Sequence, residues 1–185
     1  MNKNLLSVSL AAIMGFAGAA NAADPVTVNG GVVHFTGSVV DAPCIVDNDS
    51  SDQTVNLGQI KATTSATPDA ALGSVKPFTI HLTDCAVDTY TKAAVTFNGT
   101  TISGKNTQLA VNGGGAGATT ADGIAIQVLD NVGSVVPMDG SVASTAQTLT
   151  AADNYLQFSA QYVATAAAVT AGAANADANF SITYN

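Results

Sequence analysis

Few side chains in this sequence could perform acid–base chemistry, and they are not arranged as a catalytic group. His34 and His81 are the only histidines. His81 lies on the polar face of an expected strand, and His34 stands beside Phe35 with no partner suggested by spacing. No nucleophile motif such as G-x-S-x-G is present. We therefore expect both histidines to be structural or solvent-exposed, with no catalytic residues and no enzyme activity.

The aspartates of the segment VDNDSSDQ could supply oxygen ligands. Asp47, Asp49 and Asp52 are spaced superficially like the ligands of a calcium loop, but the glycine and the bidentate glutamate of such a loop are missing. The glycine-rich stretch 112–123 lacks the lysine and the flanking elements of a phosphate-binding loop. The sequence thus predicts solvated loops, with no metal and no cofactor.

Cys44 and Cys85 are the only cysteines, and neither stands in a CxxC redox or zinc motif. In an exported chain the simplest arrangement is one disulfide between them. The 41-residue separation predicts a stabilisation of about 4 kcal/mol on the chain-entropy model.

Export is indicated by residues 1–22, which resemble a removable signal peptide. Lys3 precedes an apolar run from Leu5 to Phe16, and small residues follow up to Ala22, after which we place cleavage. The alternative is a membrane anchor, but serines and a glycine interrupt the run, which is shorter than the roughly 20 apolar residues that a span needs. The 163 remaining residues suit one domain.

The composition favours an all-β fold. All 13 acidic residues are Asp, all five basic residues are Lys, and Glu, Arg and Trp are absent, so most charged helix formers are missing. The net charge of −8 comes without a basic patch, which argues against nucleic acid and against insertion into or binding to anionic membranes.

Alternating apolar residues predict several strands separated by Asn-Gly and Asp-Gly turns, which is typical of a β-sandwich. The low-complexity segment 164–178 is rich in alanine, but it lacks large apolar anchors, so we expect a loop or thin strand rather than a helix. The expected strand positions are Phe78, Ile80 and Leu82; Ile124, Ile126 and Val128; Leu156, Phe158, Ala160 and Tyr162; the stretches around Val55 and Leu57 and around Val95 and Phe97; and the last strand, NFSITYN.

The segment PVTVNGGVVHF contains a change of phase. Asn29-Gly30 between alternating apolar residues predicts a hairpin, but each arm would have only about three residues. The apolar positions are even up to Val32 and odd from Val33 onward, through Phe35 and Val39. One flat strand cannot serve one core with such a change, so we expect residues up to Val32 to be buried in a neighbour and later ones in their own domain. A β-bulge at Gly30-Gly31 is the alternative.

These features together resemble the major subunits of chaperone-usher pili, most closely those of type 1 fimbriae. The residues that carry the resemblance are TVNGGVVHFTGSVVDAPC at 27–44, DQTVNLGQI at 52–60, LTDC at 82–85 and AGAANADANFSITYN at the end of the chain. As in that family, a glycine (Gly172) is fourteenth from the C-terminus and a tyrosine (Tyr184) is penultimate.

The resemblance implies an incomplete immunoglobulin-like β-sandwich that is completed in trans by a donor strand. Residues 23–33 would be the donor-strand extension, with Val26, Val28, Gly30 and Val32 entering the neighbour, and 34–185 the pilin domain. The C-terminal positions Gly172, Phe180, Ile182, Tyr184 and Asn185 would form the groove strand and the chaperone contact. The implied partners are copies of the chain, a periplasmic chaperone, an outer-membrane usher and other pilus subunits.

The implied function is structural: the shaft of an adhesive pilus on the bacterial surface, reached by export through the periplasm. Two alternatives stay open. A minor or adaptor pilin near the tip would share both ends of the chain, and a self-contained carbohydrate-binding sandwich would need exposed aromatics or a metal. Aromatic residues make up only 5% of the chain.

Overall fold

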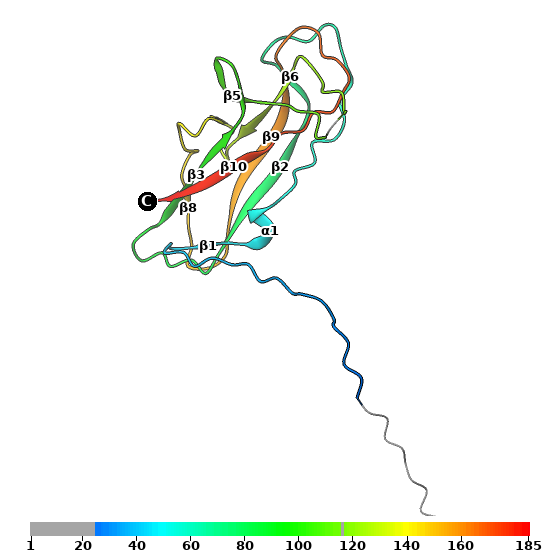
Figure 1. Cartoon of the computed structure of the whole chain (residues 1–185). Coiled ribbons are helices and arrows are strands. Elements are labelled where there is room, and N and C mark those ends of the chain that lie inside the picture. Colours follow the sequence, from blue (N-terminus) through cyan, green and yellow to red (C-terminus); the bar gives the residue numbers. More distant parts are fainter. Residues whose placement is uncertain (1–24, 116) are drawn as a thin grey trace, which may run out of the picture. The chain divides into compact units, whose positions relative to one another are not determined.

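The computed structural model describes residues 25–115 and 117–185, which divide into an N-terminal segment up to Ser38 and a compact unit from Val39 to Asn185. The signal peptide expected at residues 1–22 lies outside this range. Apart from the one-turn helix α1 (Asn48–Ser51), the regular elements of the compact unit are strands joined by loops, which confirms the all-β prediction (Figure 1). In the ranges that the structure describes, no helix is long and apolar enough to cross a membrane.

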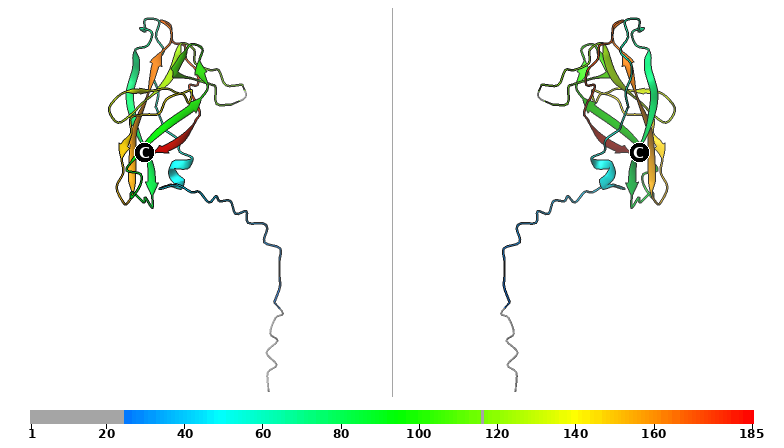
Figure 2. Two further views of the ribbon diagram at one scale, coloured as in Figure 1. Left: turned by 90° about the vertical axis from the view of Figure 1, so that its left-hand side faces the viewer. Right: turned by 90° about the vertical axis from the view of Figure 1, so that its right-hand side faces the viewer.

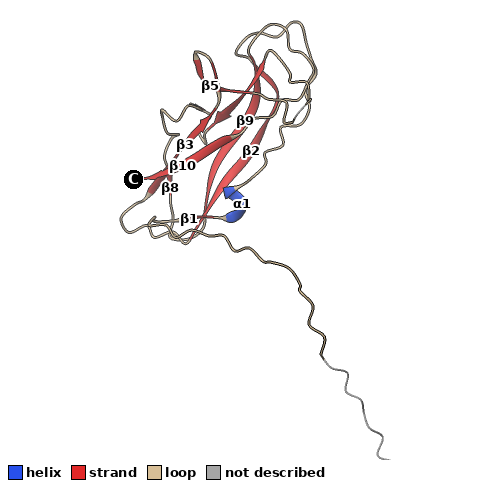
Figure 3. Cartoon of the chain, viewed as in Figure 1, coloured by secondary structure: helices blue, strands red, loops and turns tan. Residues whose placement is uncertain are grey.

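The strands form two antiparallel sheets around one core, as Figure 2 shows from two sides and Figure 3 by type of element. The larger sheet has the order β1 (Ile45–Val46), β2 (Ala71–Thr83), β9 (Asn154–Ala164), β6 (Ile124–Leu129), β5 (Lys105–Ala110) and β4 (Thr101–Ile102), and β7 (Val135–Val136) pairs with β6. The smaller sheet has the order β10 (Ala178–Tyr184), β3 (Lys92–Gly99) and β8 (Gln147–Thr148).

The predicted alternation accounts for the long strands. On β2, Ile80 and Leu82 are completely buried, whereas His81 between them is partly exposed. The inward positions predicted for β6 and β9 are likewise buried, because one face of each strand packs on the core. The two sheets meet through apolar side chains such as Val95 of β3 and Leu156 of β9.

The alanine-rich segment 164–178 is a loop with isolated bridges up to the start of β10, as expected. Its main chain pairs at single points with other loops, namely Val169 with Thr63, Ala173 with Thr120 and Asn175 with Asn112. Without large apolar side chains the segment has no helix face to bury, so its backbone groups bond to neighbouring chain segments instead.

Two local features differ from expectation. The aspartate-rich segment contains a one-turn helix, α1 (Asn48–Ser51), because the side chain of Asp47 accepts the N–H of Asp49 at 2.9 Å and caps it. The apolar stretch around Val55 and Leu57 is not a strand, although both side chains pack against the core. In the described ranges its main chain pairs with no strand, although the side-chain amide of Gln53 donates to the Thr79 carbonyl of β2 at 3.1 Å.

The N-terminal segment forms neither a hairpin nor a bulge. Residues 25–40 contain no strand, and the Asn29-Gly30 region holds only a local bond from the Gly31 N–H to the Asn29 side chain at 3.2 Å. The expectation that residues after Val32 are buried in their own domain is wrong for the single chain, since Phe35 is 91% exposed and Val33 and Val39 are also exposed. Val33, Phe35 and Val39 do not lie in a paired strand of the single chain, so their alternating side chains do not pack on its core.

The predicted disulfide between Cys44 and Cys85 is present and is buried. It lies directly before β1 and after β2, and the Ala86 N–H donates to the Pro43 carbonyl at 2.8 Å. The bridge thus fixes the start of the compact unit to the end of the longest strand.

Replacing both Cys44 and Cys85 by serine should lower the free energy of unfolding by about 4 kcal/mol, because the unfolded chain loses the constraint of a 41-residue loop. Urea unfolding followed by circular dichroism measures the difference. Reduction of the unmodified chain is the control and should shift the midpoint similarly. Equal stability of the oxidised chain and the variant would contradict the prediction.

Candidate functional site: a groove beside the last strand

The last strand, β10, is an edge of the smaller sheet. It pairs with β3 from Ala178 opposite Gly99 to Tyr184 opposite Ala93, and with no other strand in the described ranges. In an antiparallel pair every second residue turns both its N–H and its C=O away from its partner. The outer side of β10 therefore offers a row of main-chain donors and acceptors, which is a template for another strand.

The inward side chains of β10 are only partly covered. Phe180, Ile182 and Tyr184 are half-buried against the core. Their register partners on β3 include Phe97, which is 5% exposed, and Val95, which is completely buried. The inward side chains of β10 and of β3 lie on the same face of one sheet. The lower burial of the β10 side chains therefore arises at the outer flank of β10, where no further strand of the described ranges covers them.

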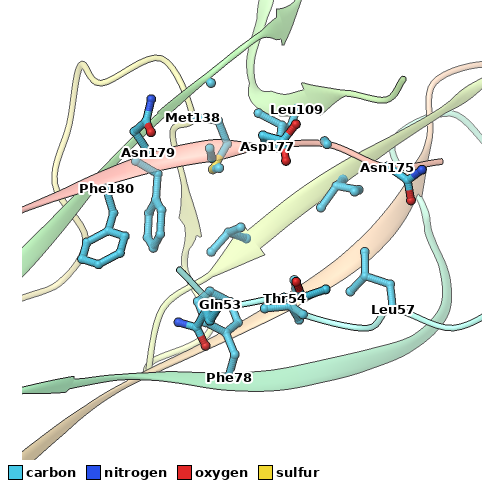
Figure 4. Close-up of a pocket in the computed structure, with 18 of the residues that line it drawn as sticks. Gln53, Thr54, Leu57, Phe78, Leu109, Met138, Asn175, Asp177, Asn179 and Phe180 are labelled. Atoms are coloured by element: carbon cyan, nitrogen blue, oxygen red, sulfur yellow. The ribbon is translucent and has the colours of Figure 1, made fainter. Parts of the chain in front are cut away.

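A groove of about 1220 Å³ lies along this flank. Its lining comes from segments far apart in the sequence, including β2, β3, β6 and the coil that follows α1 (Figure 4). The labelled side chains in the figure are Gln53, Thr54, Leu57, Phe78, Leu109, Met138, Asn175, Asp177, Asn179 and Phe180. The groove is thus an open section of the core with polar groups at its margins.

Aromatic side chains fix one wall of the groove. The ring of Phe97 lies 5.3 Å from that of Phe158, 6.4 Å from that of Phe78 and 6.5 Å from that of Phe180, measured between ring centroids. The first two contacts are edge-to-face, which is a favourable arrangement for aromatic rings. These contacts order the wall in the single chain.

A second hollow of about 620 Å³ lies at the other end of β10. Ile182 and Tyr184 line it, together with Tyr90 and Pro43. Burial raises the pKa of Tyr184, and it also raises the pKa of Tyr162 in the main groove. The two hollows thus border β10 at its beginning and at its end.

The C-terminal residue is tied to the start of β3. The main-chain oxygen of Asn185 accepts the N–H groups of Thr91 at 2.9 Å and Lys92 at 3.0 Å, and the Asn185 N–H donates to the Lys92 carbonyl at 2.9 Å. These bonds hold the end of β10 in register. The role expected for Asn185 as a chaperone contact stays a prediction.

Gly172 does not belong to the strand in which the resemblance placed it, because β10 begins only at Ala178. A Cβ atom at Gly172 would overlap the Ala121 nitrogen and lie 2.5 Å from the Thr120 carbonyl carbon. Two main-chain segments approach each other here so closely that only glycine fits. Gly172 therefore fixes the loop leading into β10.

The candidate catalytic and metal-binding side chains do not form a site. His81 stacks on Tyr155 with ring centroids 4.3 Å apart, and its Nδ1 lies 3.9 Å from an Asp47 oxygen and its Nε2 3.8 Å from an Asp153 oxygen. His34 is exposed in the N-terminal segment. Among the residues that the structure describes, no cluster of three or more His, Cys, Asp or Glu side chains could hold a metal ion.

The four expected donor-strand positions lie together in the N-terminal segment. Val26, Val28 and Val32 are 87%, 78% and 80% exposed, and no atom lies within 4 Å of the Cβ position of Gly30. Three such valines in one short segment are an unusual amount of apolar surface to leave in water. Their burial in a neighbouring subunit stays a prediction.

Sequence reasoning found β10 but missed most of the opposite wall. The coil residues Gln53, Thr54 and Leu57 line the groove, as do Leu109 and Met138. The only usable signal was the pair of alternating apolar residues Val55 and Leu57, which sequence reasoning assigned to a strand. Which core residues border an opening depends on the absence of a strand, and a linear pattern does not contain that information.

Comparison with known proteins agrees with this geometry. The family model described as "Fimbrial protein" matches residues 33–185. The chain is 43% identical to the type 1 fimbrial subunit of Klebsiella pneumoniae over the full length of both proteins. It is 41% identical to the C chain of type 1 fimbrial protein of Escherichia coli, over 100% of this chain and 99% of that one.

Solved structures give the same result. A chain from a chaperone-usher pilus structure superposes with a TM-score of 0.66 at 32% identity, covering 88% of this chain and 100% of that chain. The P pilus rod subunit PapA superposes with a TM-score of 0.60 at 29% identity, covering 78% and 100%.

The fold and the groove define a class of protein, an immunoglobulin-like sandwich that lacks one strand and assembles with other subunits into a polymer. This chain belongs to the fimbrial protein family and is a structural subunit of the pilus shaft.

Substituting Gly172→Ala should destabilise the chain by about 1 to 3 kcal/mol, because the added methyl group overlaps main-chain atoms that cannot move independently. Gly115→Ala is the matched control, since no atom lies within 4 Å of its Cβ position and its φ is not in the left-handed region. Urea midpoints compare the two variants. Equal midpoints would show that the loop relaxes at no cost.

Proposed function

We propose that this subunit polymerises by donor-strand exchange, in which residues 23–33 of one copy pair with the free edge of β10 in the next. One observation carries the proposal: an unpaired strand edge lies directly beside an open groove that exposes part of the core, including Phe78, Leu109 and Met138. A strand in this position would satisfy the outward main-chain groups of β10 and cover its half-buried side chains.

The N-terminal segment has the properties that such a strand needs. Val26, Val28 and Val32 share one face of an extended chain, because side chains alternate with a period of two. Burying three valines contributes roughly 5 to 9 kcal/mol before ordering costs. Gly30 interrupts this row, and we assign it to a point where the neighbour's groove leaves no space for a side chain.

A groove of this kind requires cover before assembly. Exposed apolar surface beside a free strand edge promotes aggregation, so an unassembled subunit needs a partner that supplies a temporary strand. We assign this role to a periplasmic chaperone that also binds the terminal carboxylate of Asn185, with transfer to the growing polymer at an outer-membrane usher. Other pilus subunits at the tip would use the same groove, and the finished polymer would support adhesion outside the cell.

The rival functions fit the geometry less well. A self-contained carbohydrate-binding sandwich has no need of an open flank along its last strand. A minor or adaptor pilin would have the same groove and donor segment, but the full-length similarity to type 1 fimbrial subunits favours the shaft.

Deleting residues 23–32 should leave a folded, chaperone-bound subunit that cannot polymerise, because the chain loses its donor strand and keeps its groove. The measurement is the formation of SDS-resistant, heat-labile ladders from purified chaperone complexes. Mixed with intact subunits, the shortened chain should still accept one donor and form an SDS-resistant pair, which is the control for folding. Pili of normal length from the deleted chain alone would overturn the proposal.

Ile182→Asp should slow subunit addition by at least about tenfold, because it puts a charge on the inward face of β10, where Ile182 packs against the core and lines the second hollow. Thr183→Asp is the matched control, since this neighbouring side chain is exposed and adds the same charge. Ladder formation over time gives both rates. Circular dichroism of each chaperone complex confirms that the variants are folded, and equal rates would count against a donor strand beside β10.

A further inference from the structure

The dipeptide Asn-Gly occurs at 29–30, 98–99 and 112–113 in this chain. At such a sequence the main-chain nitrogen of the glycine can attack the side-chain Cγ of the asparagine. A bond between nitrogen and Cγ forms, the side-chain nitrogen leaves as ammonia with the proton from the glycine N–H, and a succinimide ring remains. Water then opens either C–N bond of the ring and gives aspartate or isoaspartate. The reaction needs no co-reactant except water, and glycine favours it because no side chain hinders the nitrogen.

The side chains of Asn29, Asn98 and Asn112 are all exposed, so access of water does not distinguish them. Their main chains differ. The attack requires a glycine nitrogen that is free of hydrogen bonds and a backbone that can rotate toward Cγ. The three positions are therefore ranked by how firmly the surrounding structure holds the backbone.

The main chain at Asn98 is held on several sides. Asn98 lies in β3 opposite Asn179, and the Gly99 N–H donates to the Met138 carbonyl at 2.8 Å. The Asp177 carbonyl oxygen lies 2.8 Å from the Cβ position of Gly99, so this backbone has little room to turn. Reaction here requires the sheet to open first.

Asn112 provides a closer comparison with Asn29. At each residue the side-chain oxygen accepts the N–H two positions later, from Gly114 at 2.9 Å and from Gly31 at 3.2 Å. The local turn is thus similar, and the donated hydrogen bond draws electrons from Cγ. The main chain of Asn112, however, is bonded to Asn175 in both directions, at 2.7 and 3.1 Å. Within the described part of the chain, the main chain of Asn29 has no such bonds to a distant segment.

Asn29 thus combines the reactive dipeptide, a polarised side-chain amide and a backbone without strand partners. No atom approaches within 4 Å of the Cβ position of Gly30. We propose that Asn29 is a site of spontaneous deamidation, open in the unassembled subunit and closed once residues 23–33 are paired in a neighbour. The closing step rests on the proposed function, whereas the reactivity of the free segment does not.

The isoaspartate product would damage the segment as a donor strand. It inserts a methylene group into the main chain between Val28 and Gly30. The pattern with a period of two is then broken, so that Val26 and Val28 cannot occupy their positions when Val32 occupies its own. Ordinary aspartate at position 29 keeps the backbone spacing, and on an extended strand it lies on the face opposite the three valines. The modification would therefore withdraw old, unassembled subunits from polymerisation.

The first experiment compares the three sites within one molecule. Purified chaperone-bound subunit is incubated at 37 °C and mildly alkaline pH, and peptides are analysed over time by mass spectrometry and by an isoaspartyl methyltransferase assay. Asn29 should react at least about 100-fold faster than Asn98, because reaction at Asn98 is limited by rare opening of the sheet. Asn112 should lie between them. Equal rates at Asn29 and Asn112 would overturn the proposal.

The second experiment tests whether assembly protects Asn29 from deamidation, independently of whether Asn29 reacts in the free subunit. Assembled fibres are incubated in the same way, and Asn29 should then react at least about tenfold more slowly than in the subunit. Fast reaction in both forms would support deamidation at Asn29 but contradict its suppression in the polymer. It would also count against residues 23–33 as the donor strand. Ageing should lower the polymerisation rate of the unmodified subunit, whereas Asn29→Gln subunits should polymerise at the same rate before and after ageing, and fresh Asn29→Asp subunits should polymerise faster than aged subunits that contain isoaspartate. Loss of activity in fresh Asn29→Asp would assign the effect to charge and overturn the register argument.

Discussion

The missing neighbour of β10 determines the rest of this structure. One unpaired edge leaves main-chain groups of β10 without partners, leaves Phe180, Ile182 and Tyr184 half-buried, and opens the core into a groove. A self-sufficient domain would fill this position with its own last strand. If the donor strand of another copy fills this position, as proposed, the free-energy gain from completing the sandwich comes on association, and folding and assembly are coupled.

The groove can act as a receptor only if its walls are already in place. The disulfide fixes the start of the compact unit, Gly172 permits the close approach of the loop that leads into β10, and the bonds of Asn185 hold the far end of the strand. The aromatic contacts of Phe97 order the wall between these points. An ordered groove lowers the entropy lost on association, because most of the ordering then falls on the entering segment.

Sequence patterns predict the parts of this fold that depend on local or covalent constraints. The period of two identified β2, β6, β9 and β10, and the cysteine count in an exported chain identified the disulfide. The patterns do not predict whether a segment is strand or coil, or buried or exposed, where this depends on another segment that packs against it. Val55 and Leu57 alternate like a strand but border the groove as coil, and Phe35 alternates like a core residue but is exposed in the single chain. In both places the alternating apolar residues indicate that one face of the segment is suited to burial, but they do not show which element packs against that face.

Gly30 is a single residue whose role likewise cannot be explained from its own chain. Within its own chain, Gly30 has no neighbour within 4 Å, so nothing in the subunit explains the gap in the row of valines. A groove wall on another copy would explain it, because only glycine lets the donor backbone pass close to a surface. The same absence of a side chain leaves the Gly30 nitrogen accessible to the amide of Asn29. Under the proposed exchange, close fit in the polymer and chemical reactivity in the free subunit would thus have one cause, and pairing of the segment with β10 would preserve the first while suppressing the second.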